Sequence, residues 1–114
     1  MTREVKKMLF KDIYPLYLNK IKRKGHTKQE LIDMLCWLCG YNEVDIEACI
    51  DKNVDLETFF VDCPKLNPER KSVTGTICKV KIQEIEDEMI QNIRIMDKLV
   101  DDIAKGKKNP IWKS

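Results

Sequence analysis

The chain has 114 residues, of which 43% are hydrophobic and 35% are charged. This length suits one folded domain, and the hydrophobic fraction is too high for a disordered protein. The net charge is only +2, but residues 1–28 and 105–114 are basic, whereas residues 29–104 between them are acidic. The sequence contains no apolar run of membrane-spanning length and no secretory signal, so we expect a soluble cytoplasmic protein without membrane contact.

The first helix is expected to begin near Pro15, because the first turn of a helix is where a missing N–H is tolerated. Apolar side chains then recur every three or four residues as far as Ile21, which leaves the lysines among them on the outside. Gly25 is a residue that ends helices, and the cations before it lie at the negative end of the helix dipole.

The second helix has the clearest start signal in the sequence. Thr27 and Glu30 have the spacing of a capping box, in which each side chain binds the free backbone N–H of the other residue. Asp33 is the only polar side chain in residues 31–39, a pattern that is typical of a helix in the middle of a bundle. Gly40 is expected to end this helix in the left-handed conformation.

Two shorter helices are expected to follow. Asn42 is a suitable N-cap for a helix that runs to about Lys52, and Asp55 is a suitable N-cap for a helix that must end before Pro64. Residues 64–75 are rich in turn-forming residues and are predicted to form the longest loop.

Apolar residues with spacings of three and four continue from Cys78 to Ile103. They predict a long C-terminal helix from about residue 77 to Gly106, interrupted near Asp87. The alternation of apolar residues over positions 78–82 fits a strand instead, so the choice between helix and extended chain is open for residues 76–87. Because the spacing is close to a heptad repeat, this helix is the expected contact with a second copy or another protein.

Several short stretches match the pattern of a known family. They are Tyr14-Pro15-Leu16-Tyr17, Cys36-Trp37-Leu38 with Gly40-Tyr41, Glu57-Thr58-Phe59-Phe60, Leu66-Asn67-Pro68, and Glu84-Ile85-Glu86-Asp87 with Asp97-Lys98-Leu99. In order and spacing, over about residues 8–107, the chain resembles the small bacterial proteins of the domain-of-unknown-function family twenty-two hundred. The resemblance implies a helical bundle whose helices cross at steep angles. It implies no activity, cofactor or site residue.

Two positions depart from the pattern of this family. Cys39 stands where Thr is usual, which implies that the Cys-x-x-Cys sequence is particular to this chain. Glu88 stands where Pro usually follows the acid at Asp87, which implies that a helix break near Asp87 belongs to the family. We therefore predict an all-α fold, a small orthogonal bundle of four to six helices with a long C-terminal helix. Residues 1–106 are expected to form one helical domain, and residues 107–114 a basic, flexible tail.

The five cysteines are expected to be reduced, because an odd number without a secretory signal argues against a disulfide framework. Cys36 and Cys39 have the spacing of a redox motif, but they fall in the last turn of a helix, where the dipole disfavours a thiolate. Zinc would need two more ligands, and no second closely spaced pair of donors is present. Both thiols are therefore predicted to be buried and unreactive, and no metal or cofactor is predicted.

No catalytic residue is predicted. His26 is the only histidine, so it has no second histidine to support it, and it is expected in a turn between two helices. The sequence contains no nucleophile elbow and no glycine-rich phosphate loop. The second and third helices have the order of a helix-turn-helix, but acidic residues on the expected reading helix, residues 43–52, would repel DNA phosphates.

The function itself is not determined by the sequence, and three hypotheses follow. The first is a protein–protein interaction or accessory protein without catalytic activity, as a homodimer or with another protein. The second is nonspecific binding of nucleic acid by the basic segments. Its candidate residues are Lys20, Lys22, Arg23, Lys24, Lys107 and Lys108. The third is an enzyme with a pocket near the loop, which would use Asn67, Glu69 and Arg70.

Overall fold

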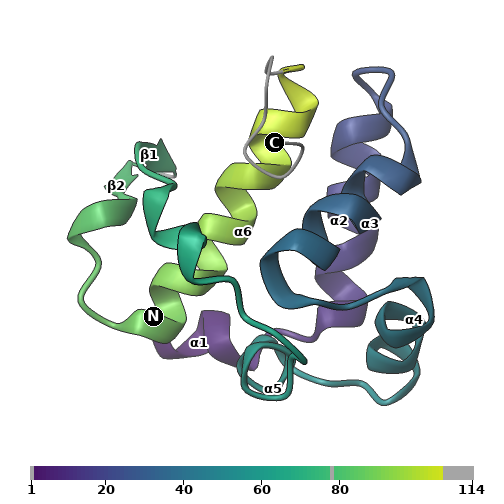
Figure 1. The fold of residues 1–114 in the computed structure, drawn as a ribbon, viewed down its shortest axis with the longest axis horizontal. Helices are drawn as coiled ribbons and strands as arrows, with labels where there is room; N and C mark the ends of the chain where they lie inside the picture. Colours follow the sequence, from purple (N-terminus) through teal and green to yellow (C-terminus); the bar gives the residue numbers. More distant parts are fainter. Residues whose placement is uncertain (1, 78, 107–114) are drawn as a thin grey trace.

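Six α-helices, two short 3₁₀-helices and one small hairpin make up the computed structural model, which describes residues 2–77 and 79–106 (Figure 1). In chain order they are α1 (Thr2–Lys7), α2 (Phe10–Lys22), α3 (Lys28–Cys39), α4 (Glu43–Asp51), α5 (Leu56–Val61), η1 (Pro68–Ser72), β1 (Thr76–Ile77), β2 (Val80–Lys81), η2 (Ile82–Glu84) and α6 (Glu88–Ala104). The prediction of an all-α fold with a long C-terminal helix is confirmed. Within these ranges no helix combines the length and the apolar character that crossing a lipid bilayer requires.

The C-terminal helix α6 is the element around which the others pack. Helices α1, α2, α3 and α5 all contact it, and Figure 1 shows it standing beside α2 and α3. Its apolar side chains are buried by these neighbours, so that Ile93 is 1% exposed and Met96 is 0% exposed. The apolar face that predicted contact with a second copy is therefore used inside the chain.

The predicted start of the first helix is wrong, because α2 begins at Phe10 and Pro15 lies inside it. Phe10 is fully buried and its ring stacks on that of Phe59 at a centroid distance of 4.3 Å. The backbone before the helix is also held, since the N–H of Phe10 donates to the carbonyl of Val54 at 2.9 Å. Pro15 itself is exposed. Because proline has no N–H, the backbone carbonyl one turn earlier has no partner within the helix, and water can bind it there. Tertiary contacts thus decide where α2 begins.

Helix α1, which precedes it, has no counterpart among the predicted elements.

Of the two alternatives for residues 76–87, the continuous helix is wrong, and the extended chain is correct for Thr76–Ile77 and Val80–Lys81. Strands β1 and β2 form an antiparallel hairpin in which Ile77 is paired with Val80, and Lys79 in the turn has a positive φ of 65°. Ile82 continues the helical spacing of apolar residues because it is fully buried. It belongs, however, to the short 3₁₀-helix η2 and not to an α-helix. Residue 78 lies outside the described residues.

The predicted break near Asp87 is confirmed, since Asp87 is the N-cap of α6 and its side chain accepts from the N–H of Ile90 at 3.2 Å. Glu88 occupies the first helical position, which also tolerates proline because its N–H has no partner within the helix. The proline that the family resemblance implies at this position would therefore suit the same helix start as the glutamate here.

Local capping signals elsewhere are confirmed as predicted. Thr27 and Glu30 form both hydrogen bonds of a capping box, Asn42 caps α4, and Asp55 caps α5. Gly40 ends α3 with a left-handed φ of 80°. Most of the apolar residues of α3 are fully buried, including Leu31, Met34, Leu35 and Leu38, so this helix lies in the interior as expected.

Candidate functional site

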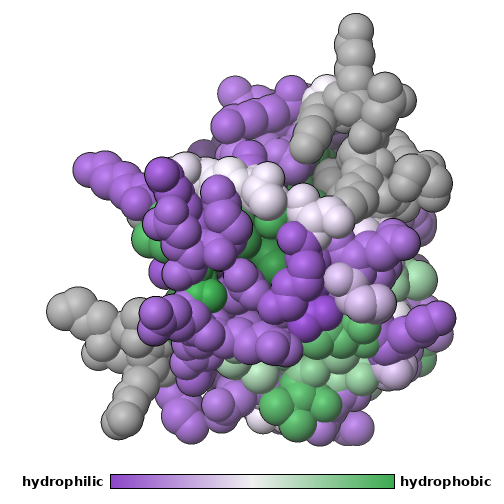
Figure 2. All heavy atoms as spheres, turned by 60° about the vertical axis from the view of Figure 1, so that its left-hand side comes forward, coloured by the Kyte–Doolittle hydropathy of each residue, from purple (hydrophilic) through white to green (hydrophobic). Residues whose placement is uncertain are grey.

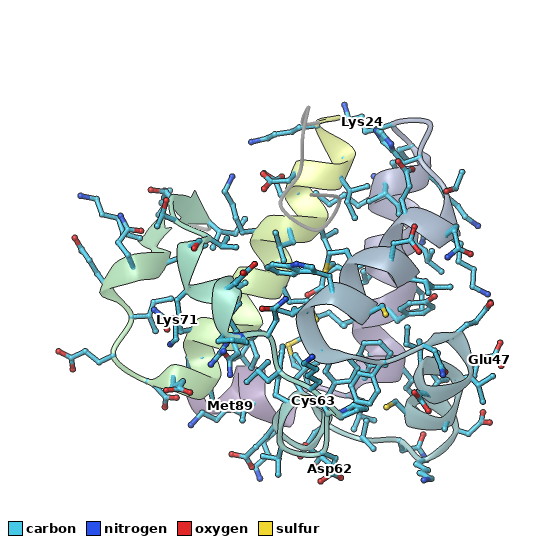
Figure 3. The ribbon with its side chains drawn as sticks, in the orientation of Figure 1. Lys24, Glu47, Asp62, Cys63, Lys71 and Met89 are labelled. Carbon is cyan, nitrogen blue, oxygen red and sulfur yellow. The ribbon has the colours of Figure 1, made fainter. Side chains whose placement is uncertain are left out.

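The basic residues predicted to bind nucleic acid lie at one end of the molecule. Lys20 and Lys22 lie in the last turn of α2, and Arg23 and Lys24 follow directly. Lys105 follows the last turn of α6, at the same end, and Figure 3 shows Lys24 near that turn. We call Lys20, Lys22, Arg23, Lys24 and Lys105 the basic end. Lys107 and Lys108 lie outside the described residues.

One carboxylate joins the two halves of the basic end. Asp101 on α6 binds the ammonium group of Lys20 at 3.1 Å and that of Lys105 at 2.9 Å. Partial burial raises the pKa of the Asp101 carboxyl, but the hydrogen bonds from Lys105 and Lys20 outweigh this effect and hold that pKa below its usual value. Two segments separated by about 80 residues are thus brought together by Asp101.

The remaining cations of the basic end are exposed. Among the described residues, no carboxylate forms an ion pair with Lys22, Arg23 or Lys24. Lys20 is itself 47% exposed despite its ion pair. The basic end therefore presents more positive charge to solvent than its own carboxylate offsets.

His26 lies in the turn between α2 and α3, as the sequence predicts. Its Nδ1 lies 3.1 Å from Oε2 of Glu30, the residue that completes the capping box at the start of α3. The ring therefore contacts a residue that stabilises the start of a helix, next to the basic end.

A second group of polar side chains surrounds the C-terminal end of α3. The N–H of Lys65 donates to the carbonyl of Cys39 at 2.9 Å, and the N–H of Asn67 donates to that of Leu38 at 2.9 Å. The side-chain amide of Asn67 donates to the carbonyl of Trp37 at 3.0 Å. The last carbonyls of a helix have no partner within it, so residues 65–67 serve as an external cap.

Arg70, on the 3₁₀-helix that follows, is only 7% exposed. Its Nε donates to Oδ1 of Asn92 at 2.7 Å, its Nη1 to the carbonyl of Asn67 at 2.9 Å, and its Nη2 to Oε1 of Glu88 at 3.2 Å. We call these four residues the Arg70 network. It ties the predicted loop to α6, so the loop is held by specific bonds in this structure.

The prediction that both thiols of the Cys-x-x-Cys sequence are buried is wrong for Cys36. Cys39 is fully buried, whereas Cys36 is exposed. Cys36 lies one helical turn after Asp33, which is also exposed, so both belong to the solvent-facing side of α3. Asp33, the single polar residue in this stretch, is the sequence signal that could have identified the exposed face.

Cys63 is the partner of Cys39 that sequence reasoning missed. It follows α5 and is half-buried against the end of α3 (Figure 3). The Cys39 thiol donates a hydrogen bond to the Cys63 sulfur, which lowers the pKa of Cys63 to about 7 against the opposing effect of burial, and the charge of Arg70 acts in the same direction. The same hydrogen bond and burial raise the pKa of Cys39.

The pocket expected beside the loop is present at the surface. Its volume is about 450 Å³, and it is lined by Cys36, Trp37, Gly40, Lys65, Asn67, Pro68 and Glu69. Asn67 and Glu69 were predicted for it, but Arg70 does not line it because its guanidinium is bound in the Arg70 network. Asn67 is in turn occupied as a cap. Within residues 2–77 and 79–106, no three His, Cys, Asp or Glu side chains are placed to hold one metal ion.

The structure removes the reason for the predicted homodimer, because the apolar face of α6 is buried inside the chain. Among the large apolar side chains that are exposed in the described part of the chain, Met8 lies between α1 and α2. The others lie on four different elements: Leu16 on α2, Val44 on α4, Val61 on α5 and Val80 on β2. Figure 2, which brings the hairpin side forward, shows mostly hydrophilic side chains, with a group of hydrophobic side chains in the lower part of the view. A homodimer or a complex with another protein therefore stays a prediction, and the apolar face of α6 no longer supports it.

Comparisons with known proteins agree with the resemblance seen in the sequence. The family described as "Uncharacterized protein conserved in bacteria (DUF2200)" matches residues 4–111. The chain is also similar to a solved structure described as "Crystal structure of uncharacterized protein SP1917", with 41% identity and a TM-score of 0.87 over 94% of this chain and 88% of that chain. No curated protein matches the sequence. Neither description assigns a function, so any function has to be inferred from the residues themselves.

Proposed function

The chain belongs to the bacterial protein family DUF2200, whose description assigns no activity. From the geometry we propose that the chain binds the backbone of nucleic acids through the basic end, without sequence preference. The observation that carries this proposal is the convergence of two basic segments of the chain on Asp101. We place this activity in the cytoplasm, where nucleic acid is available.

The charge of the basic end supports contact with phosphates. Lys22, Arg23 and Lys24 are consecutive and exposed, and no carboxylate in the described ranges is paired with them. Lysine and arginine side chains that neutralise phosphates release counterions, and this release drives nonspecific binding. The basic end offers no set of side chains arranged to read base edges, so binding without sequence preference is the form expected.

Cations near the C-terminal end of a helix also stabilise the helix dipole, and this is the competing explanation for Lys22, Arg23 and Lys24. The two explanations differ in what the three charges change. A purely structural role alters stability and leaves nucleic-acid binding unaffected. A binding role alters affinity and its salt dependence.

The test is the binding of fluorescein-labelled, mixed-sequence duplex DNA, measured by fluorescence anisotropy. Three phosphate contacts predict a slope of about −2.7 for log affinity against log salt, hence an affinity about 40-fold lower at 200 mM than at 50 mM salt. The triple variant Lys22→Ala, Arg23→Ala, Lys24→Ala should lose most of the binding at 50 mM salt and most of this slope.

A charge-matched control removes three other exposed lysines, with the changes Lys7→Ala, Lys11→Ala and Lys52→Ala. The proposal requires that this control retain the affinity and slope of the natural chain. Equal losses in both variants would show that only the net charge matters, and absence of binding at 50 mM salt would end the proposal.

A further inference from the structure

The thiols of Cys39 and Cys63 are in contact but differ in their access to solvent. Cys39 is 0% exposed on α3, whereas Cys63 is half-buried on the segment that passes the end of this helix (Figure 3). The backbone brings the segment of Cys63 to the end of α3, because the N–H of Lys65, two residues further on, donates to the carbonyl of Cys39 at 2.9 Å. A small reagent from solvent therefore reaches Cys63 before it reaches Cys39.

Charged groups around the pair favour a thiolate on Cys63. Cys39 donates to it from α3, and the guanidinium of Arg70 acts on it from η1. The neighbouring carboxylate of Asp62 acts in the opposite direction, as does burial. The balance lowers the pKa of Cys63 to about 7, so a large part of this thiol is ionised near neutral pH. The thiolate is the form that attacks an electrophile.

We propose that Cys63 and Cys39 form a peroxide-sensitive thiol pair, in which Cys63 is oxidised first and Cys39 then closes a disulfide with it. In the first step the Cys63 thiolate attacks one oxygen of a hydroperoxide. An S–O bond forms, the O–O bond breaks, and the leaving oxygen takes up from solvent the proton that Cys63 released when it ionised. With hydrogen peroxide the products are a sulfenic acid on Cys63 and one water.

In the second step the Cys39 sulfur attacks the Cys63 sulfur. An S–S bond forms, the S–O bond breaks, and the departing hydroxide takes the Cys39 proton to give a second water. In total the two thiols lose two protons and two electrons, and hydrogen peroxide is reduced to two waters. Cys39 is suited to this second role by its position, because it is 0% exposed and a reagent from solvent does not reach it before Cys63.

The pair differs from the Cys-x-x-Cys sequence that the chain displays. Cys36 lies on the solvent-facing side of α3 and lines the surface pocket, while Cys39 faces the interior and Cys63. A disulfide between Cys39 and Cys63 would form next to the backbone hydrogen bond that joins Lys65, two residues after Cys63, to Cys39. It would also close a loop of 24 residues, so the oxidised protein should unfold at a higher denaturant concentration than the reduced protein.

The test treats the folded chain with hydrogen peroxide, blocks the remaining thiols with iodoacetamide, and maps the tryptic peptides by mass spectrometry. Trypsin places Cys36, Cys39 and Cys49 together on the peptide 29–52, and Cys63 on the peptide 53–65. The double variant Cys36→Ser, Cys49→Ser is therefore used beside the natural chain, because its peptide 29–52 holds only one thiol. The expected product is the linked pair of peptides, two hydrogens lighter than their sum, which a reductant separates.

A second variant, Cys39→Ala, separates the two steps. Dimedone, which captures sulfenic acids, should label Cys63 in this variant, and no linked peptide should form. The pH midpoint for alkylation of Cys63, near 7 in the natural chain, should rise when Cys39 is replaced, because the hydrogen bond to the thiolate is lost. Circular dichroism checks that the variant is folded.

The proposal is overturned if Cys63 stays reduced under conditions that oxidise Cys36. It is equally overturned if Cys63 proceeds to sulfinic acid in the double variant without a bond to Cys39. An unchanged alkylation midpoint in the folded Cys39→Ala variant would remove Cys39 from the activation of Cys63. None of these outcomes depends on nucleic-acid binding.

Discussion

The basic end and the Arg70 network are both charged, yet they are built in opposite ways. At the basic end, exposed ammonium groups share one carboxylate, Asp101, whose side chain is 17% exposed. In the Arg70 network, an arginine that is only 7% exposed donates from each of its three side-chain nitrogens to a different partner. Water competes with exposed ion pairs far more than with buried hydrogen bonds. The network therefore contributes to stability, whereas the basic end is free to contribute to binding.

The largest effect is expected from Arg70→Ala. This change leaves the buried amide of Asn92 without its partner and removes the bond to the carbonyl of Asn67, so unfolding should become easier by about 3 kcal/mol. Urea unfolding followed by circular dichroism measures this difference. The neighbouring variant Lys71→Ala, which changes an exposed residue, should stay within about 0.5 kcal/mol of the natural chain. Similar losses for both variants would contradict the contrast between the buried network and the surface.

The next effect concerns the turn that follows α3. Gly40→Ala should destabilise the protein by about 2 kcal/mol, because the residue has a positive φ and a Cβ atom there would lie 3.1 Å from the backbone nitrogen of Lys65. Gly25 provides a matched control, since its φ of 83° is similar and a Cβ atom there would meet nothing within 4 Å. Gly25→Ala should therefore cost only about 1 kcal/mol. Equal costs in urea unfolding would show that the external cap of residues 65–67 does not constrain this turn.

A pH-dependent effect is expected at Asp97 on α6, which accepts a hydrogen bond from Tyr17 on α2. Burial raises the pKa of this carboxyl, although the hydrogen bond from Tyr17 and the charge of Arg94 act against burial. A carboxyl with a pKa that is higher in the folded protein contributes stability at low pH, and this contribution is lost as the pH rises through that pKa. The free energy of unfolding of the variant Asp97→Asn, relative to that of the natural chain, should therefore be higher at about pH 7 than at about pH 3. Urea unfolding at both pH values measures the gain, and a difference independent of pH would contradict it.

The smallest effect on stability is expected from Lys20→Ala. The Lys20 side chain is 47% exposed in its ion pair with Asp101, and Lys105 still binds the same carboxylate. The free energy of unfolding should therefore change by less than about 0.5 kcal/mol. The affinity for duplex DNA at low salt should fall nonetheless, because one cation of the basic end is removed. A marked loss of stability with unchanged DNA binding would assign Lys20 to the fold rather than to binding.

Local signals predicted the helix ends well, because a cap depends on a few neighbouring residues. Thr27, Asn42 and Asp55 all cap helices where the sequence places them, and Asp87 marks the break before α6. Pro15 misled for the opposite reason. The start of α2 is decided by the stacking of Phe10 on a ring from α5, and no local pattern contains that contact.

The candidate sites were predictable only in part. The basic residues and the Cys-x-x-Cys spacing are visible in the sequence, but the partner of Cys39 is not Cys36. Cys63 stands 24 positions further along the chain, and its only sequence signal is a position at the start of the predicted loop. The role of Arg70 was equally hidden, since its hydrogen-bond acceptors lie on the loop and on α6.

By itself the sequence determined the all-α class, the central position of α3 and most of the helix ends, because propensity, periodicity and caps act over a few residues. Tertiary structure alone decided that the apolar face of α6 is used inside the chain. It also decided that Lys20 and Lys105 meet at one carboxylate, and that Cys39 contacts Cys63. These contacts join residues far apart in the chain, and they form because burying the apolar faces of the helices fixes how the helices pack.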